Sequence, residues 1–590
     1  MKQFFKFMFA SMLGTILTIL IVFFLLMGLV MSIASYSEKE AISIKPNTVL
    51  HMKLNTPIFD RTPKNPFEQF NFQTMEPLEM IGLNDILNNL EKAAKDPNIK
   101  GIYLDLSVIP TGMATIEEIR DALIEFKQSG KFIICYGNVL DQAAYYMASV
   151  ADEIYMSPEG MILFKGLNAE VLFLKGTLEK LDIDMQVIRE GKYKGAIEPF
   201  TRENLSEANR EQIQELIKVV WSQISGTIAE SRNIDIYDLN LIANNLDVTN
   251  SASALKHKFI DGLKYKDEIT TLLKKKLNIE EDNKIEQISI SKYTHVKVDK
   301  KEKEYTRDRI AVVYGSGNII MGQGDEQTMG AEKVSKALRQ ARNDDNVKAI
   351  VFRVNSPGGD AFASDIIWRE VQLAAETKPL VVSMGDLAAS GGYWISTPAD
   401  RILADPITIT GSIGAYGMFP NLKDFFNNKL GITFDNVKTN ENADFLSISK
   451  PLSSYQEQII EQEMDQVYNS FLQKVASGRK LSVDYVDSIG QGRVWSGSDA
   501  KRIGLVDEFG GLKRSIKAAA ELSELTNYRI KELPELKDPI EEFFNTLFGN
   551  PSANLIQQEL GSYYDYYQYL KSIKESNGIQ ARMPYLIEFN

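Results

Sequence analysis

The chain has 590 residues, 44% of them hydrophobic, and a formal net charge of -13. This length is too great for one hydrophobic core, so at least two globular domains are expected. The acidic balance argues against a nucleic-acid partner, because such a partner requires a basic surface. The single cysteine, Cys135, excludes an intrachain disulfide, and its apolar setting in KFIICYG is typical of a buried strand rather than a reactive thiol.

Residues 1–40 are expected to form a membrane anchor. No residue between Phe7 and Tyr36 is charged, and this run is longer than the roughly 20 residues that cross a bilayer. A cleavable secretory signal has an apolar core of only about 7 to 15 residues, so a retained anchor is favoured over a cleaved one. Lys2 and Lys6 precede the run. The positive-inside rule therefore places the N-terminus in the cytoplasm and the rest of the chain outside it.

The sequence after the anchor contains an internal repeat. IKGIYLDLSVIPTG (99–112) parallels VKAIVFRVNSPGG (347–359), and YGNVLDQAAYYMASVADEIYMSP (136–158) parallels MGDLAASGGYWISTPADRILADP (384–406). The second pair is offset by 384 − 136 = 248 residues, and so are Ser206 and Ser454, each at the start of a helical stretch. A repeat of this length indicates two related domains, expected at 45–280 and 310–530.

Each half alternates apolar strands with helical stretches, which predicts an α/β fold whose parallel sheets are covered by helices on both faces. Ser454 and Glu457 have the spacing of a capping box and predict the start of a long helix. The charged segment 281–309 is interpreted as a solvated connector, although some of its residues alternate as in a strand. The tail, 531–590, contains a helical stretch, EEFFNTLF, and an aromatic run, YYDYYQYL, that would suit association.

Two glycine-rich loops follow strands of the second half. RVNSPGGD contains Gly358 and Gly359, whose backbone N–H groups could face a ligand because no Cβ blocks the approach. MGDLAASGGYWIS places Ser390 at a strand-to-helix turn, where a nucleophile would gain the N–H of Gly391 for a developing oxyanion. On the pattern alone, small residues that pack a helix tightly on the sheet explain this loop equally well.

A serine nucleophile requires a base. The chain has three histidines, His51, His257 and His295. They lie in a strand-like run, a charged helical segment and the connector, which argues against a Ser-His-Asp triad. A lysine can act instead if burial removes its charge near neutral pH. Lys194, in VIREGKYKGAIEPF, lies among small residues and is the candidate, although a lysine is far more often an ordinary surface residue.

The repeat supports this assignment. In the first half, Gln142 occupies the position of Ser390, since 142 + 248 = 390, and the position of Lys194 falls near Asn442 or Ala443 in the second half, with no lysine there. The first half therefore lacks the serine that the second half has, and the second half lacks the lysine that the first half has. If the halves pack as a pseudo-dimer, one site across their interface would contain both Ser390 and Lys194, and a second site would be empty.

RVNSPGGD, MGDLAASGGYWIST, ITGSIGAYG and EGKYKGAIEPF together resemble the motifs of the long, tandem-domain form of signal peptide peptidase A, also called protease IV. The resemblance covers essentially the whole chain. It implies a fold of the caseinolytic-protease and crotonase kind and the cleavage of signal-peptide remnants and other small hydrophobic peptides. It also implies a homotetramer on the periplasmic side of the inner membrane.

The same resemblance implies a role for individual residues. Ser390 would be the nucleophile and Lys194 the base, and Ser412 would hold Lys194 by a hydrogen bond. Lys192 lies close to Lys194 in the sequence but would not be the base. The oxyanion hole would be supplied by Gly358, Gly359 and Gly391. Two residues depart from the family pattern, Gly195 and Asp360, each where a serine is common. Neither departure removes a catalytic atom, so they bear on substrate preference.

Two other functions were weighed against a peptidase. A catalytically silent membrane scaffold of the same fold predicts the loss of Ser390 or Lys194, and both are present. A crotonase-type acyl-CoA enzyme would usually place a carboxylate where this chain has AASGG. No metal or cofactor is expected, because the sequence offers neither an HExxH motif nor a Cys/His cluster.

Overall fold

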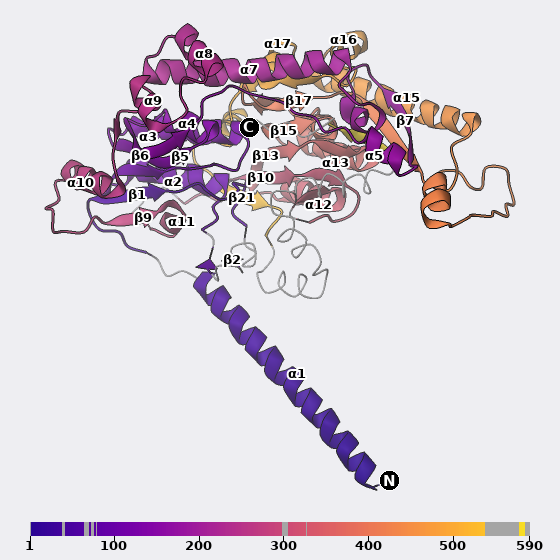
Figure 1. Ribbon diagram of the computed structural model, residues 1–590, viewed down its shortest axis with the longest axis horizontal. Coiled ribbons are helices and arrows are strands. Elements are labelled where there is room, and N and C mark those ends of the chain that lie inside the picture. Colours follow the sequence, from indigo (N-terminus) through magenta and orange to yellow (C-terminus); the bar gives the residue numbers. More distant parts are fainter. Residues whose placement is uncertain are drawn as a thin grey trace.

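The structure is a computed structural model that describes residues 2–37, 42–63, 70–71, 76–77, 79–297, 305–325, 327–536 and 578–583. The two halves form one body, from which the 36-residue helix α1 (Lys2–Ser37) projects (Figure 1). Over the described ranges, no helix meets the joint requirement of length and hydropathy for crossing a bilayer. The expected membrane anchor therefore stays a prediction.

The first half is built on a six-stranded parallel sheet in the order β8-β6-β5-β4-β1-β9. Its strands are β1 (Thr48–Met52), β4 (Ile99–Asp105), β5 (Phe132–Leu140), β6 (Glu153–Ile162), β8 (Gly262–Leu263) and β9 (Gln287–Ser289). Successive side chains of a strand point to opposite faces. Ile134 accordingly packs with α10 (Lys266–Leu277), while Cys135 faces the main core, with α2 (Leu83–Lys95) and α3 (Met113–Lys127).

The second half repeats this plan. Its strands are β10 (Arg309–Ser316), β13 (Val347–Ser356), β15 (Leu380–Ala389), β16 (Arg401–Ala404), β17 (Ile409–Gly411), β19 (Val494–Ser496), β20 (Glu508–Phe509) and β21 (Arg529–Leu533). They pair in parallel, except that β17 and β19 are antiparallel. The predicted α/β fold with two related parallel sheets is therefore confirmed.

Helices cover both sheets and connect their strands. In the first half these are also α4 (Gln142–Ala148), α5 (Lys175–Lys180), α6 (Glu198–Thr201), α7 (Glu207–Arg232), α8 (Ile236–Asn245), α9 (Ser251–Lys256) and α11 (Ile290–Tyr293). In the second half they are α12 (Ala331–Asn343), α13 (Ala361–Ala375), α14 (Gly391–Trp394), α15 (Ser454–Arg479), α16 (Val483–Ile489), α17 (Gly497–Arg502) and α18 (Leu512–Leu522). The long helix α7 of the first half reaches along the body to contact β19 of the second (Figure 1).

The two halves share a hydrophobic core. The cluster that contains Leu50 and Leu104 of the first half also contains Val351, Leu512 and Ala518 of the second. Helix α18 contributes most directly, because it packs on β13 and β15 and presents Leu512 to the same cluster. Burial of apolar surface between the halves favours their association. They therefore pack as the pseudo-dimer that the repeat suggested.

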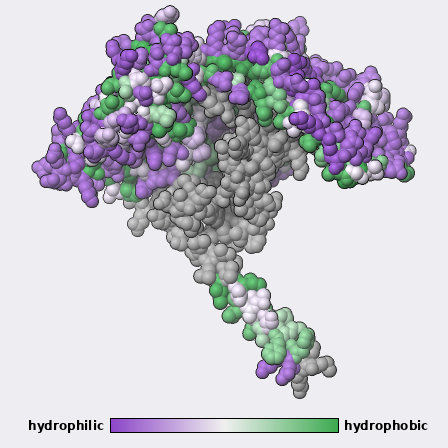
Figure 2. All heavy atoms as spheres, viewed as in Figure 1, coloured by the Kyte–Doolittle hydropathy of each residue, from purple (hydrophilic) through white to green (hydrophobic). Residues whose placement is uncertain are grey.

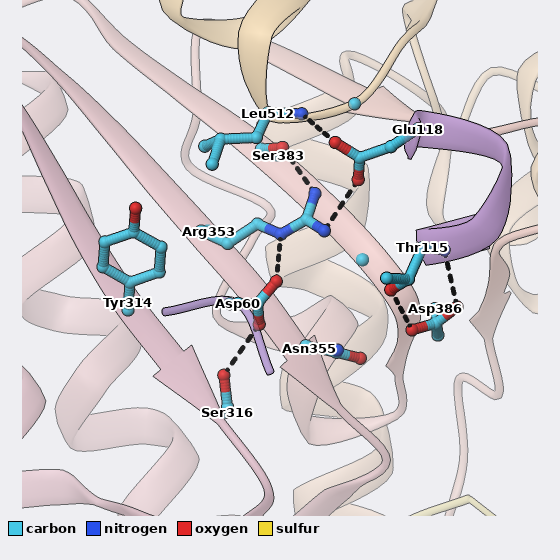
Figure 3. Close-up of polar contacts among 12 residues, drawn as sticks. Asp60, Thr115, Glu118, Tyr314, Ser316, Arg353, Asn355, Ser383, Asp386 and Leu512 are labelled. Carbon is cyan, nitrogen blue, oxygen red and sulfur yellow. Dashed lines mark hydrogen bonds and ion pairs between the residues drawn. The ribbon is translucent and has the colours of Figure 1, made fainter. Parts of the chain in front are cut away.

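A buried charge network crosses the same interface (Figure 3). The guanidinium of Arg353, on β13, pairs with Asp60 at 2.8 Å and with Glu118, on α3, at 2.7 Å. Arg353 is fully buried, and both carboxylates are almost so. Burial alone would lower the pKa of Arg353, but the two carboxylates outweigh that effect and raise it, so the cation is retained. Nearby, the hydroxyl of Thr115 donates to the carboxylate of Asp386 at 2.6 Å.

A third sheet combines strands from both halves in the order β12-β11-β14-β22-β18-β7. Its members are β12 (Thr328–Gly330), β11 (Asn318–Ile320), β14 (Gly358–Asp360), β22 (Gly578–Arg582), β18 (Ala415–Asn421) and β7 (Asp184–Glu190). Strand β7 belongs to the first half and pairs antiparallel with β18 of the second along its whole length. A short two-stranded sheet, β2 (Phe70–Asn71) and β3 (Glu76–Pro77), lies apart.

The structure departs from the sequence expectations in three places. The cap of α15 is Ser453 with Gln456, one residue before the predicted pair Ser454 and Glu457. The segment 281–309 is not solvated throughout, because β9 joins the first sheet and Ile290 and Tyr293 are buried. Within the tail 531–590, EEFFNTLF and YYDYYQYL lie outside the described residues, whereas β22, which was not predicted, is a strand.

Candidate active site

Lys194 reaches the interface on the turn that follows β7. Gly191, with φ +109°, ends the strand in a conformation that favours glycine, and the next turn is held by the Tyr193 N–H, which donates to Gln491 O at 2.8 Å. Gly492 packs directly on the lysine, since a Cβ on Gly492 would stand 2.7 Å from Lys194 Cβ. The side chain of Lys194 is fully buried. A segment of the second half thus encloses a lysine of the first.

Ser390 lies at the end of β15, immediately before the short helix α14. Its backbone has φ +55° and ψ -115°, a conformation that costs a non-glycine residue free energy, and its N–H donates to Gly411 O at 2.7 Å. Residues held in such strained geometry cluster at active sites. Ser390 is fully buried.

The two predicted residues meet across the interface of the halves. Lys194 Nζ lies 2.7 Å from Ser390 Oγ, 2.9 Å from Ser412 O and 3.0 Å from Ser412 Oγ. A neutral amine can donate its two N–H bonds to the two oxygens of Ser412 and turn its lone pair towards Ser390 Oγ. The arrangement therefore suits transfer of the serine proton to the lysine.

Burial sets the protonation of this lysine. Desolvation is the cause that lowers the pKa of Lys194 well below its ordinary value, because a fully buried ammonium loses its hydration. The three groups at hydrogen-bond distance are uncharged, so no nearby carboxylate offsets the loss. The neutral, proton-accepting form is thus favoured over a much wider pH range than for a solvated lysine.

The three predicted oxyanion-hole glycines lie together beside Ser390. Gly358, with φ +95°, approaches so closely that a Cβ on it would stand 2.6 Å from Gly391 N. The N–H of Gly358 already donates to Ser356 Oγ at 3.1 Å. Gly391 is the first residue of α14, and the first N–H groups of a helix have no partner within it. The N–H of Gly391 is therefore better placed for an oxyanion than that of Gly358.

Lys192, Asp360 and Gly195 were also singled out in the sequence, and each has well-defined contacts. Lys192 is exposed, and its Nζ lies over the ring of Tyr193 rather than near Ser390. Asp360 caps α13, because its carboxylate accepts the N–H of Ala363 at 2.7 Å. At Gly195, a Cβ would stand 2.3 Å from Asn209 Nδ2, so a serine would not fit without movement of Asn209. The contact at Gly195 accounts for that departure from the family pattern, whereas the cap at Asp360 does not, because a serine caps a helix equally well.

The first half has no equivalent pair. Gln142, at the position of Ser390, starts α4, and its side chain is tied to the following loop by bonds to the Lys165 and Gly166 N–H groups and to Gly166 O, all at 3.1 Å. In the second half, Asn442 and Ala443, at the position in the repeat that is equivalent to Lys194, are exposed. Among the described residues, the repeat therefore provides the Ser-Lys pair at one of its two equivalent positions and not at the other.

Sequence reasoning missed Gln491, Gly492 and the strand β22, all of which lie at this site. Gln491 and Gly492 fix the turn that carries Lys194, but nothing in GQGRVW distinguishes them from an ordinary loop. β22 pairs with β14 on one side and with β18 on the other. Only the pairing of distant strands could have revealed it.

Comparisons with known proteins agree with the division of the chain into two related halves. The model of Peptidase family S49 matches residues 125–280 and 372–526, once in each half, and the model of Clp protease matches residues 284–402. The two S49 matches begin 372 − 125 = 247 residues apart, close to the repeat offset. They support a tandem α/β architecture of the Clp protease kind.

Curated relatives align over most of the chain. "Protease 4" of Haemophilus influenzae is 37% identical over 75% of this chain and 73% of its own length. "Protease 4" of Salmonella typhi is 36% identical, with 81% and 78% covered. "Serine protease SPPA, chloroplastic" of Arabidopsis thaliana is 33% identical, with 85% and 74% covered.

Proposed function

Because the chain belongs to peptidase family S49 and is a serine peptidase, we propose that it cleaves peptides with a Ser-Lys dyad, Ser390 as nucleophile and Lys194 as general base. The observation that carries this proposal is the 2.7 Å separation of Lys194 Nζ and Ser390 Oγ in a fully buried setting. A nucleophile and a base within hydrogen-bond distance are the signature of covalent catalysis.

The reaction would proceed through an acyl-enzyme. Neutral Lys194 takes the hydroxyl proton as Ser390 Oγ attacks the substrate carbonyl carbon, and the N–H groups of Gly359 and Gly391 stabilise the oxyanion. Lys194 then returns the proton to the leaving amine as the peptide C–N bond breaks. A water molecule, deprotonated by the same lysine, hydrolyses the ester. Ser412 keeps the amine oriented throughout by accepting both of its N–H bonds.

The substrates would be cleaved signal peptides and other small hydrophobic peptides. The support is the resemblance of the motifs to signal peptide peptidase A. An extended peptide is the suitable form, because β14 and β18 can both pair with an added strand.

A pH profile tests the role of the lysine. With a quenched fluorescent hydrophobic peptide, kcat/KM is expected to rise with pH through the lowered pKa of Lys194 and then level off, because only the neutral amine accepts the proton. The Ser390→Ala variant should show no such rise of kcat/KM with pH. A wild-type rate that is flat from pH 6 to 9 would remain compatible with a pKa below 6, so the scan extends to the lowest pH at which the protein stays folded. A rate that falls as pH rises over that range would contradict the dyad.

We also propose that α1 anchors the protein in a membrane with its N-terminus in the cytoplasm. The support is the uncharged run from Phe7 to Tyr36 and the way α1 projects from the body (Figure 1). The coloured part of α1 in Figure 2 is mostly green to near-white, with hydrophilic residues at its N-terminal end. The expressed chain should stay in the membrane fraction after alkaline carbonate washing, whereas a chain that starts at residue 42 should be washed off. Release of both would contradict the anchor. The homotetramer stays a prediction.

A further inference from the structure

A buried glutamine of α7 lies between the backbone segments that carry the candidate base and nucleophile. Gln212 is 1% exposed, and its Nε2 donates to Tyr193 O at 2.9 Å. Its Oε1 accepts the Val494 N–H at 3.1 Å. Tyr193 belongs to the first half and Val494, on β19, to the second. One side-chain amide therefore bonds to the backbone on both sides of the interface.

Both bonds end close to a residue of the proposed dyad. The donor bond ends beside the base, since Tyr193 directly precedes Lys194. The acceptor bond ends on β19, which pairs with β17 at Gly411, and Gly411 O accepts the Ser390 N–H at 2.7 Å. A displacement of either backbone segment would thus change the distance between the two catalytic side chains.

A neighbouring residue of α7 orients this amide. Asn209, three residues earlier, is fully buried, and its Oδ1 accepts a further N–H of Gln212 Nε2. A side-chain amide has two N–H donors on one end and an oxygen acceptor on the other. Both ends of Gln212 are therefore bonded. Because a buried polar group is costly when its bonds are broken, the amide is held in one orientation.

The repeat indicates that this glutamine serves the site and not the packing of the helix. Helices α7 and α15 follow Ser206 and Ser454, which are offset by 248 residues, so the position of Gln212 falls on Ile460 in α15, since 212 + 248 = 460. Ile460 is also buried. Where the repeat provides no lysine, the equivalent helix thus has an apolar residue, and packing alone does not require an amide.

We propose that Gln212 is a positioning residue, which holds Lys194 and Ser390 at their catalytic separation through the backbone of both halves. This inference rests on the proposed dyad. The serine proton can pass to the lysine only while the two atoms stay within hydrogen-bond distance. A misplacement of about 1 Å in such an arrangement can lower the rate about 100-fold. Since Gln212 acts through the backbone, its loss should lower kcat and leave KM largely unchanged.

Gln212→Met in the full chain tests this inference. Methionine keeps the length of the side chain but removes the donor and the acceptor, so kcat per active site for a quenched fluorescent peptide should fall by about 10–100-fold. KM should change by less than about twofold. Active sites are counted by labelling Ser390 to completion with a fluorophosphonate. Partial unfolding alone would lower the number of labelled sites and leave kcat per labelled site at the wild-type value, and that result would overturn the inference.

A second buried glutamine provides the matched control. Gln456, near the start of α15, is buried to the same extent, donates to Asn442 Oδ1 at 3.3 Å and accepts the Ser453 N–H at 3.1 Å. Gln456→Met should therefore keep kcat per labelled site within about twofold of the wild type, as for a change remote from the chemistry. An equal loss in the two variants would contradict a specific role for Gln212.

Gln212→Glu gives a second readout, which depends on pH. A protonated carboxyl group keeps one donor for Tyr193 O and one acceptor for the Val494 N–H, whereas the ionised form has no donor. The kcat of this variant should therefore fall again at high pH, where that of the wild type stays level. A profile that stays level at the wild-type height would show that the donor is not needed.

The wild type separates this inference from the proposed function. If the folded wild type shows no hydrolysis that Ser390→Ala abolishes, the Ser-Lys proposal fails and this inference fails with it. If the wild type is active and Gln212→Met has the same kcat per labelled site, the positioning role alone is wrong and the dyad stands.

Discussion

Lys194→Met is expected to lower kcat/KM for a peptide substrate by about 10⁵-fold, the same loss as for Ser390→Ala, because residues that act as one catalytic unit fail together. Methionine keeps the length and apolar packing of the side chain but cannot accept the proton of Ser390. The double variant should therefore be no less active than either single one. Steady-state kinetics at the plateau of the pH profile provides the comparison.

The neighbouring lysine is the matched control for this prediction. Lys192 is two residues away and exposed, so Lys192→Met should retain the wild-type kcat/KM within about twofold, as for a surface change remote from the chemistry. Circular dichroism should show that all four variants, the double variant included, are folded. Substantial activity in Lys194→Met would exclude this lysine as the base. A large loss of activity in Lys192→Met would indicate that Lys192, and not Lys194, had been the correct choice of base.

Arg353→Met is expected to destabilise the folded protein by about 3–5 kcal/mol, because it leaves the buried carboxylates of Asp60 and Glu118 without their cation. Urea denaturation measures the change in the free energy of unfolding. Since Asp60 and Glu118 lie in the first half and Arg353 in the second, the loss falls on the interface that brings Lys194 to Ser390. Peptidase activity should consequently disappear at a lower urea concentration than in the wild type.

A surface ion pair supplies the control for this second prediction. Arg502 is 67% exposed and pairs with Asp499 at 2.9 Å, so Arg502→Met should cost only about 0–1 kcal/mol. Adding Glu118→Gln to Arg353→Met should recover part of the lost stability, because one of the two stranded charges is removed. If Arg353→Met were as stable as Arg502→Met, the buried network would not be holding the halves together.

Local patterns predicted the parts of the fold that depend on local physics. Alternating apolar strands and helices indicated the parallel sheets, and the buried setting of Cys135 followed from KFIICYG. The meeting of Lys194 and Ser390 was also predictable, but for a different reason. The repeat places equivalent residues at equivalent positions in two related domains, so a loss in each half pointed to one shared site.

Long-range pairing explains what could not be predicted. β22 is a short run, GIQAR, and it becomes a strand only because β14 and β18 leave room for one. Arg353 stood in a motif chosen for its glycines, and the carboxylates that neutralise it come from 293 residues earlier at Asp60 and from Glu118. The exact start of α15 could not be predicted either. Ser453 and Ser454 are adjacent and can both cap a helix, so the sequence alone does not select Ser453.

The separation of Lys194 and Ser390 by 196 residues sets an order of events during synthesis. When the first half emerges from the ribosome it carries the proposed base but not the proposed nucleophile, and β7 still lacks its partner β18. Chemistry has to wait until residues beyond Gly492, which encloses the lysine, have been made and have docked. If the proposed dyad is the catalytic pair, the nascent polypeptide therefore has no peptidase activity until the second half has been synthesised and has packed against the first.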